Sequence, residues 1–360
     1  MPDFTQQIKN IETEIRETPY HKGTEHHIGK LRARLARLRD KEIESEAKTK
    51  GGGGAGYAVK KQGDATVVLI GPPSVGKSTL INKLTNTQSK VAEYAFTTLN
   101  VIPGMLFYKD AYIQIFDVPG IIAGAKEGKG KGKEVLSVAR NADLLLIMCD
   151  VDTIDRFGLI EKELYAAGLR INTVPADISI DKKTEGGITI RSNIKQEISH
   201  ESIAEIAKEM GLKNAEISLK EKLNINQLID AFSPNRVYLP ALYVINKIDK
   251  NPKISLSTFQ SKPILISAEN GIGLDKLKES LWEKLNLLRV YFVQPEEEPS
   301  FKNPVVAKKG MTLLDIAENI GDEFALDKTA AKIWGPDARF PGQELSLSTR
   351  VAEGMQIRFV

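Results

Sequence analysis

An eight-residue run, Gly71-Pro72-Pro73-Ser74-Val75-Gly76-Lys77-Ser78, constrains the fold of this chain more than any other feature. It follows the apolar run TVVLI and precedes STLINKL, in which apolar residues recur at helical spacing. The glycines of such a G-x-x-x-x-G-K-S run let backbone N–H groups wrap phosphate oxygens, and the next helix adds positive potential at its N-terminus. The sequence therefore predicts a phosphate-binding loop between a strand and a helix.

Further short apolar runs indicate that this strand belongs to a sheet. They are YIQIFDV, ADLLLIMCD, ALYVINKID and KPILISA, and helical stretches alternate with them. Continuous apolar strands bounded by turn residues are buried on both faces, as in a parallel sheet covered by helices. The expected fold class is therefore α/β, with a nucleotide-binding domain built on a parallel-type sheet covered by helices.

Composition narrows the class of protein. With 360 residues the chain suggests two to three domains of about 150 residues each. A content of 41% hydrophobic and 27% charged residues excludes a disordered or collagen-like chain. No apolar run approaches the roughly 18 residues of a membrane span, and the first residues are polar and charged. We expect a cytoplasmic protein without a membrane partner.

The run LLLIMCD contains the only cysteine, Cys149, so an internal disulfide framework and a cysteine-based metal cluster are excluded. Cys149 is expected to be a buried packing residue rather than a reactive thiol. Asp150 and Asp152 follow it and could mimic a metal-binding pair, but a capping or turn role is expected for them.

Changes in pattern divide the chain into six segments. The first contains two amphipathic helical patterns, and the second of these carries basic residues from Lys30 to Lys41, on a face that is either solvated or in contact with RNA or the ribosome. The expected segments are a helical hairpin (1–50), a glycine-rich linker (51–63), the first part of the nucleotide-binding domain (64–167), an inserted α+β subdomain (168–234), the second part of the nucleotide-binding domain (235–289) and a small mixed C-terminal domain (290–360).

A D-x-x-G motif at the end of a later strand is expected to complete the phosphate site. Asp117 ends the run YIQIFD, and its carboxylate can hold the Mg²⁺ shell together with the Ser78 hydroxyl. Gly120, three residues on, can donate its N–H to a γ-phosphate, so the loop after it would sense hydrolysis.

A threonine between the two motifs is expected to supply another oxygen. Thr98 in Phe96-Thr97-Thr98 is the first choice for completing the Mg²⁺ shell, and Thr97 is the alternative. Lys77 reaches the β- and γ-phosphates. The expected metal ligands are Ser78, Thr98 and Asp117, and the expected catalytic residues are Lys77, Thr98 and Gly120.

The identity of the base is expected to be read by Asn246-Lys247-Ile248-Asp249, again at a strand end. A carboxylate at Asp249 can accept from the ring N–H and the exocyclic amine of guanine, a donor pair that adenine lacks. This argues against an ATPase. The backbone of the next strand end could donate to the guanine O6. The expected nucleotide-binding residues are Ser74, Val75, Gly76, Lys77, Ser78, Thr79, Asn246, Lys247, Asp249, Ser267, Ala268 and Glu269.

These motifs resemble the translation-factor class of P-loop GTPases and, more narrowly, the Obg-related developmentally regulated GTP-binding proteins. The resemblance rests on EYAFTTLNVIPG, DVPGIIAGAKEGKGKGKEVLSVAR and NKID, and extends over essentially the whole chain. It implies an N-terminal helical hairpin, a ribosomal-protein-like insert and a C-terminal ubiquitin-like TGS domain of β-grasp fold. It also implies a GTP-hydrolysing factor linked to ribosomes and translation.

Hydrolysis is expected to be slow without a partner. Many regulatory GTPases have glutamine directly after D-x-x-G, whereas this chain has Ile121, whose side chain cannot orient water. A backbone atom, a bound K⁺ ion or a partner such as the ribosome could supply the missing group. Ser74 stands where K⁺-dependent relatives often have asparagine, which weakens the K⁺ interpretation.

The segment after Ile121 alternates glycines and lysines from Gly124 to Lys133, and we expect it to be a switch that orders on GTP binding or on docking to RNA or the ribosome. The competing interpretation is an RNA- or ribosome-binding scaffold that GTP stabilises and in which hydrolysis is incidental. Whether a stabilising protein partner exists stays open.

Overall fold

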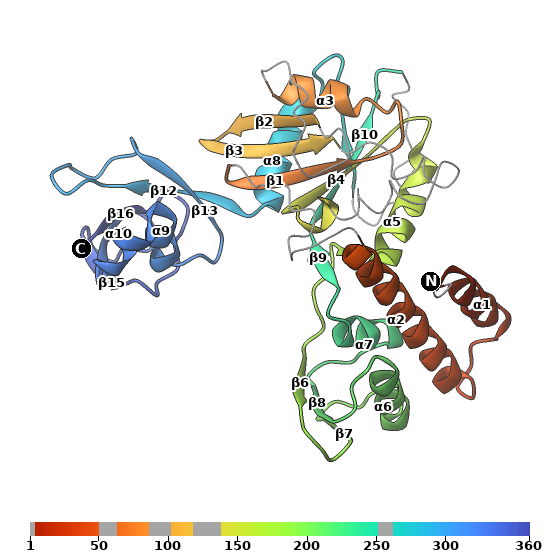
Figure 1. The fold of residues 1–360 in the computed structure, drawn as a ribbon. Coiled ribbons are helices and arrows are strands. Elements are labelled where there is room, and N and C mark those ends of the chain that lie inside the picture. The colour runs from red at the N-terminus through yellow and green to blue at the C-terminus, as the bar shows by residue number, and fades with distance from the viewer. Residues whose placement is uncertain (1–3, 50–62, 86–101, 118–137, 251–261) are drawn as a thin grey trace. The chain divides into compact units, whose positions relative to one another are not determined.

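The computed structural model describes residues 4–49, 63–85, 102–117, 138–250 and 262–360 (Figure 1). It divides into two compact units. The first unit comprises Met1–Gly56 and Glu161–Leu239, and the second unit comprises Tyr57–Ile160 and Pro240–Val360. Within the described ranges no helix is both long enough and apolar enough to cross a membrane.

A six-stranded sheet forms the centre of the second unit, with the strand order β11-β10-β4-β1-β3-β2. The apolar runs expected to be strands do form parallel strands, and every residue of the two central strands β1 and β4 is buried. The parallel strands are β1 (Ala65–Ile70), β3 (Ala111–Asp117), β4 (Leu144–Asp150), β10 (Ala241–Asn246) and β11 (Ile264–Leu265).

The edge strand β2 (Ile102–Tyr108) was not expected, and it runs antiparallel to β3. Its sequence IPGMLFY contains Pro103 and Gly104, which usually interrupt a strand but are tolerated at a sheet edge. Gly104 is required by packing, because a Cβ atom there would lie 2.6 Å from the Ile81 side chain. The expected parallel sheet therefore gains one antiparallel edge.

Two helices cover one face of this sheet and build the main core of the second unit. The helices are α3 (Lys77–Leu84) and α8 (Leu274–Lys284), while η2 (Ile154–Arg156) and α5 (Phe157–Ala166) follow β4. Leu80 and Ile81 of α3 and Leu277 of α8 are fully buried against alternate residues of β1, such as Val67. Truncating such a side chain to alanine typically costs about 2–5 kcal/mol.

The C-terminal part of the second unit contains a mixed five-stranded sheet in the order β13-β12-β16-β14-β15. Its strands are β12 (Leu287–Phe292), β13 (Pro304–Lys308), β14 (Ala330–Trp334), β15 (Gln343–Ser346) and β16 (Gln356–Phe359), with helices α9 (Leu313–Ile320) and α10 (Asp322–Leu326). The run GMTLLDIAENI forms α9, and MQIRFV forms β16, as their patterns predict. A capping box of Thr312 and Asp315 begins α9.

The first unit combines two N-terminal helices with an α+β segment. Its elements are α1 (Phe4–Glu17), α2 (Glu25–Thr49), β5 (Leu169–Ile171), β6 (Ile178–Lys182), β7 (Ile188–Ser192), α6 (His200–Glu209), β8 (Ala215–Leu219), α7 (Ile225–Phe232) and β9 (Val237–Leu239). β6 and β7 do not pair with each other, because both flank β8, β6 antiparallel and β7 parallel. Ala33 of α2 is fully buried in a core shared with α6 and α7.

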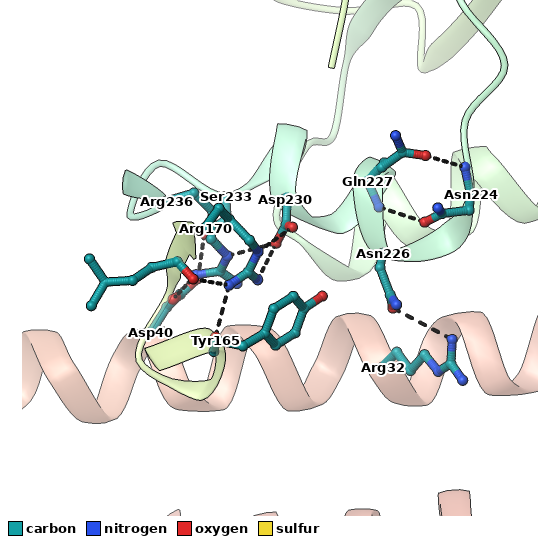
Figure 2. A network of polar contacts seen from close by, with 11 residues as sticks. Arg32, Asp40, Tyr165, Arg170, Asn224, Asn226, Gln227, Asp230, Ser233 and Arg236 are labelled. Carbon is teal, nitrogen blue, oxygen red and sulfur yellow. Dashed lines mark hydrogen bonds and ion pairs between the residues drawn. The ribbon is translucent and has the colours of Figure 1, made fainter. Parts of the chain in front are cut away.

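A buried network of ion pairs joins α2, β5 and α7 within the first unit (Figure 2). Asp230 accepts two hydrogen bonds from Arg170, at 2.5 Å each, and one from Arg236 at 2.9 Å. Arg236 also donates to Asp40 at 2.8 Å, and Ser233 donates to the second oxygen of Asp40 at 2.7 Å. None of the four charged side chains is more than 10% exposed.

Candidate functional site

The loop at residues 71–76 follows the central strand β1, at the point where the sheet order changes direction. In open α/β sheets, ligands bind outside the carboxyl ends of the strands at such a point. A Cβ atom on Gly71 would lie 2.1 Å from the Met148 carbonyl oxygen, and one on Gly76 would lie 2.5 Å from the Asn246 side chain. Gly76 also has φ +92°, and Ser74 has φ +63°. The loop is therefore packed against β4 and β10 so closely that glycine is required at both positions.

Lys77 begins α3 and holds its ammonium group inside this loop. The residue is 8% exposed, and its Nζ donates to the carbonyl oxygens of Gly71 at 3.1 Å and Pro72 at 2.9 Å. Burial lowers the pKa of Lys77, and the negative charge of Asp117 offsets part of that effect. The cation therefore lies among groups that could exchange for phosphate oxygens.

Ser78 and Asp117 form a donor set that fits Mg²⁺. Ser78 Oγ donates to Asp117 Oδ2 at 2.8 Å, while the other carboxylate oxygen is buried and has no hydrogen-bond partner within the described residues. A buried, unpaired carboxylate oxygen is costly unless a cation or donor satisfies it. Across the described part of the chain no cluster of three or more His, Cys, Asp or Glu could hold a metal ion. One hydroxyl and one carboxylate suit Mg²⁺, which takes its other ligands from phosphate and water.

Asn246 links the loop to the turn that follows β11. Its amide Nδ2 donates to the Val75 carbonyl oxygen at 2.8 Å, and its Oδ1 accepts the Ala268 backbone N–H at 2.9 Å. Asn246 as a whole is 3% exposed. Because both ends of this amide are used, the phosphate loop and the turn containing Ser267 and Ala268 are held at a fixed separation.

Lys247 connects the same loop to β4. It has φ +62°, and its Nζ donates to the Ser74 carbonyl oxygen at 2.7 Å and to Asp150 Oδ2 at 2.6 Å. Asp150 was expected to have a capping or turn role. Its backbone N–H does donate to the Thr153 hydroxyl, and that hydroxyl donates to Asp150 Oδ1. Its contact with Lys247 was missed. The available signal was position, since Asp150 ends β4 in register with Asn246 of β10.

Of the predicted site residues, the structure brings Lys77, Ser78, Asp117, Asn246 and Lys247 together around the loop at 71–76. It does not describe some of the others. Thr79 lies in the first turn of α3, and Asp249 and Glu269 lie in the turns that follow β10 and β11. Thr97, Thr98, Gly120 and Ile121, together with the glycine- and lysine-rich segment 124–133, lie outside the described residues.

Comparison with known proteins gives family matches over most of the chain. The family model described as "50S ribosome-binding GTPase" matches residues 66–182, and the one described as the C-terminal region of the MMR_HSR1 domain matches residues 185–287. Among solved structures, the Schizosaccharomyces pombe YchF GTPase superposes with a TM-score of 0.47 at 14% identity, over 84% of this chain and 99% of that one.

Relatives that match over nearly their whole length carry informative names. A GTP-binding protein of Methanocaldococcus jannaschii is 44% identical, over 97% of this chain and 90% of its own. Developmentally-regulated G-protein 3 of Arabidopsis thaliana is 39% identical, over 96% of this chain and 95% of its own. Ribosome-interacting GTPase 1 of Saccharomyces cerevisiae is 39% identical, over 97% of this chain and 96% of its own.

Proposed function

Because the chain belongs to the developmentally regulated GTP-binding proteins, a family of P-loop GTPases, we propose that it hydrolyses Mg²⁺-bound GTP to GDP and phosphate as a ribosome- or RNA-associated switch in translation. The observation that supports this most strongly is the Ser78–Asp117 hydrogen bond, with its unpaired carboxylate oxygen, beside the Lys77 ammonium. Cytoplasmic location follows from the same proposal.

The phosphate end of the proposed site neutralises charge. Backbone N–H groups of residues 74–79 and the Lys77 ammonium would hold the phosphate oxygens, and the bound Mg²⁺ would neutralise charge that develops on them. Ser78 and Asp117 would hold the metal ion, with Thr98 as first choice for a further ligand and Thr97 as the alternative. Gly120 would donate its N–H to the γ-phosphate.

The base end of the proposed site selects guanine. Asp249 would accept from the ring N–H and the exocyclic amine, while the Lys247 stem would pack along the base. The backbone at Ser267, Ala268 and Glu269 would donate to the guanine O6. The bond from Ala268 N–H to Asn246 Oδ1 holds that turn beside Asn246, and this N–H would exchange its partner to reach the guanine O6.

We assign the remaining segments by the same family membership. Residues 1–50 are a helical hairpin, 51–63 a linker, 64–167 with 235–289 the GTPase domain, 168–234 a ribosomal-protein-like insert and 290–360 a TGS domain. The ribosome role is supported by the name of the yeast relative, Ribosome-interacting GTPase 1. Association with ribosomal RNA through Lys129, Lys131 and Lys133 would weaken with salt, because lysine–phosphate contacts release counterions.

Single-turnover hydrolysis of GTP, with and without ribosomes, tests the proposal. Lys77→Ala provides the blank, and Asp117→Asn tests the metal role through the Mg²⁺ concentration it requires. We expect slow turnover alone and at least about tenfold stimulation by ribosomes, equivalent to about 1.4 kcal/mol off the barrier. Tight GTP binding without hydrolysis under either condition would favour a scaffold that GTP stabilises.

A second comparison addresses Ile121, which stands where many GTPases have glutamine. Turnover in potassium chloride and in sodium chloride at equal ionic strength tests whether a K⁺ ion takes over the role of the missing water-orienting group. Equal rates would remove the K⁺ hypothesis and leave a backbone atom or the ribosomal partner as the source.

A further inference from the structure

Asp150 is a buried carboxylate beside the proposed nucleotide site, and one of its two oxygens binds a lysine. It is the last residue of β4 and is 5% exposed. Its Oδ1 accepts the Thr153 hydroxyl at 2.7 Å, and its Oδ2 accepts Lys247 Nζ at 2.6 Å. One oxygen is therefore used to anchor the carboxylate in its own turn, and the other is used to hold the lysine.

The lysine is held from two sides. Its ammonium group donates to Asp150 and to the Ser74 carbonyl oxygen, the latter at 2.7 Å. The side chain of Lys247 remains 27% exposed, whereas the side chain of Asp150 is only 7% exposed. A charge buried to that degree needs its partner, because removing the partner leaves an uncompensated ion. The pair is therefore unlike an exposed ion pair, in which either member can leave at little cost.

Lys247 itself and its partner Ser74 both have unfavourable backbone conformations. Ser74 has φ +63° and Lys247 has φ +62°, a left-handed region that side chains other than glycine rarely adopt. Such conformations persist only when surrounding contacts hold them. The contacts of Lys247 with Ser74 and with Asp150 are of that kind. They run from the segment 246–249, called here the base-reading turn, to the phosphate loop and to β4.

We propose that Asp150 is a positioning residue for guanine-nucleotide binding, which fixes the Lys247 ammonium against the Ser74 carbonyl and so holds the base-reading turn and the phosphate loop in the binding-competent arrangement. This inference rests on the proposed function, because it assumes that the nucleotide lies against Lys247 and the phosphate loop. Asp150 itself touches no nucleotide in this arrangement. Its effect is on affinity and release, and not on the chemical step.

Release of a fluorescent GDP analogue from Asp150→Asn measures that effect. Asparagine keeps an oxygen that can accept from Lys247 and removes the charge that attracts it. We expect release to accelerate about tenfold, which corresponds to about 1.4 kcal/mol of lost binding free energy. Single-turnover GTP hydrolysis at saturating nucleotide should stay within about twofold of wild type. Asp152→Asn is the matched control, since this exposed neighbour lies in the same turn.

A double-mutant cycle with Lys247→Met separates positioning from general stability. Methionine keeps an unbranched apolar stem and removes the ammonium, so the contact with Asp150 no longer exists. If Asp150 acts through Lys247, Asp150→Asn has little further effect on release in the Lys247→Met background. An equal acceleration in both backgrounds would overturn the proposal, as would unchanged release in Asp150→Asn alone.

Two controls distinguish a wrong role for Asp150 from an unfolded variant and from a wrong proposed function. Thermal unfolding of the nucleotide-free variants shows whether Asp150→Asn is folded, and an unfolded variant is replaced by Asp150→Ser, which also removes the charge. Binding of GDP and ADP analogues to wild-type protein tests the proposed function alone. If wild type prefers ADP or binds neither, the proposed function fails. If wild type binds GDP but the effects of Asp150→Asn and Lys247→Met on release are additive, the proposed role of Asp150 is wrong while the proposed function stands.

Discussion

Glu279 of α8 accepts the hydroxyl hydrogen of Tyr108 at 2.7 Å, and its other carboxylate oxygen accepts Lys109 Nζ at the same distance. Lys109 and Asp110 have φ +49° and φ +66°, as in the two-residue turn that joins β2 to β3. The carboxylate therefore ties a tight hairpin turn to the helix packed beneath it. Asp117, at the far end of β3, belongs to the same hairpin.

This contact predicts a loss of stability in alkali that depends on Tyr108. The hydrogen bond with Glu279 and burial raise the pKa of Tyr108 from 10 to about 12, so the folded state favours the neutral phenol. The stabilisation is fully present below pH 10 and is lost as the pH rises from about 10 toward 12, because the unfolded chain ionises first.

Tyr108→Phe should remove that component, and chemical denaturation between pH 9 and 12 measures it. Absorbance titration of the phenols provides a direct check, since the wild type minus Tyr108→Phe difference should show a group that titrates near pH 12. Tyr20→Phe, at an exposed tyrosine, controls for the loss of one phenol. A difference spectrum that titrates near pH 10 would contradict the assignment.

The buried network around Asp230 predicts a large effect of one substitution. Asp230→Ala would leave the buried Arg170 and Arg236 without their shared carboxylate. Breaking a buried ion pair in this way typically costs about 3–5 kcal/mol. Urea denaturation followed by circular dichroism measures the change in free energy of unfolding.

Asp177→Ala is the matched control within the same unit, because the Asp177–Lys220 pair is more than half exposed on both sides. An exposed pair of this kind contributes less than about 1 kcal/mol. Equal destabilisation by both substitutions would show that the buried network carries no special share of the stability.

Gly76→Ala should weaken nucleotide binding. Its Cβ would lie 2.5 Å from Asn246 Nδ2 and would be held at φ +92°. Relief of the clash moves Asn246 away from Val75, so affinity for a GDP analogue should fall at least about tenfold, or about 1.4 kcal/mol. Gly186→Ala has φ +98° with nothing within 4 Å, and therefore tests backbone strain alone. Comparable affinity losses in both variants would contradict the steric explanation.

The strands of the second unit could be predicted because burial on both faces leaves a direct trace in the sequence. All residues of LLLIMCD in β4 are apolar except the last, and all are buried. β2 left no such trace, since Pro103 and Gly104 are compatible with a strand only at an edge, and edge position is a property of the assembled sheet. In the same way, the pairing of β6 and β7 through β8 depends on a strand later in the chain.

Candidate residues were predictable where a motif is local and not where a contact joins distant segments. The run from Gly71 to Ser78 indicates a phosphate loop by spacing alone. The contact of Asp150 with Lys247 spans 97 positions and is carried by neighbouring strands β4 and β10. Aspartate at a strand end is also common in turns, so its second bond could be found only once the sheet order was known.

Cys149 offers a test of how the end of β4 opens. It is the only cysteine in the sequence and is fully buried. Burial raises the pKa of its thiol from 9.0 to about 12, the hydrogen bond with Thr153 offsetting part of the effect. Because the thiolate is the nucleophile that attacks thiol reagents, the native protein should react only slowly at pH 8, whereas the unfolded protein should react rapidly with one equivalent.

Slow labelling of the native protein then reports opening beside Asp150. A nucleotide that binds only the closed arrangement at 100 times its dissociation constant stabilises it by about 2.7 kcal/mol. Labelling should slow by about a hundredfold on adding GDP, provided that opening requires nucleotide release. Asp150→Asn should raise the labelling rate in GDP more than it raises the rate without nucleotide. Rates that do not respond to GDP would show that β4 opens independently of the proposed site.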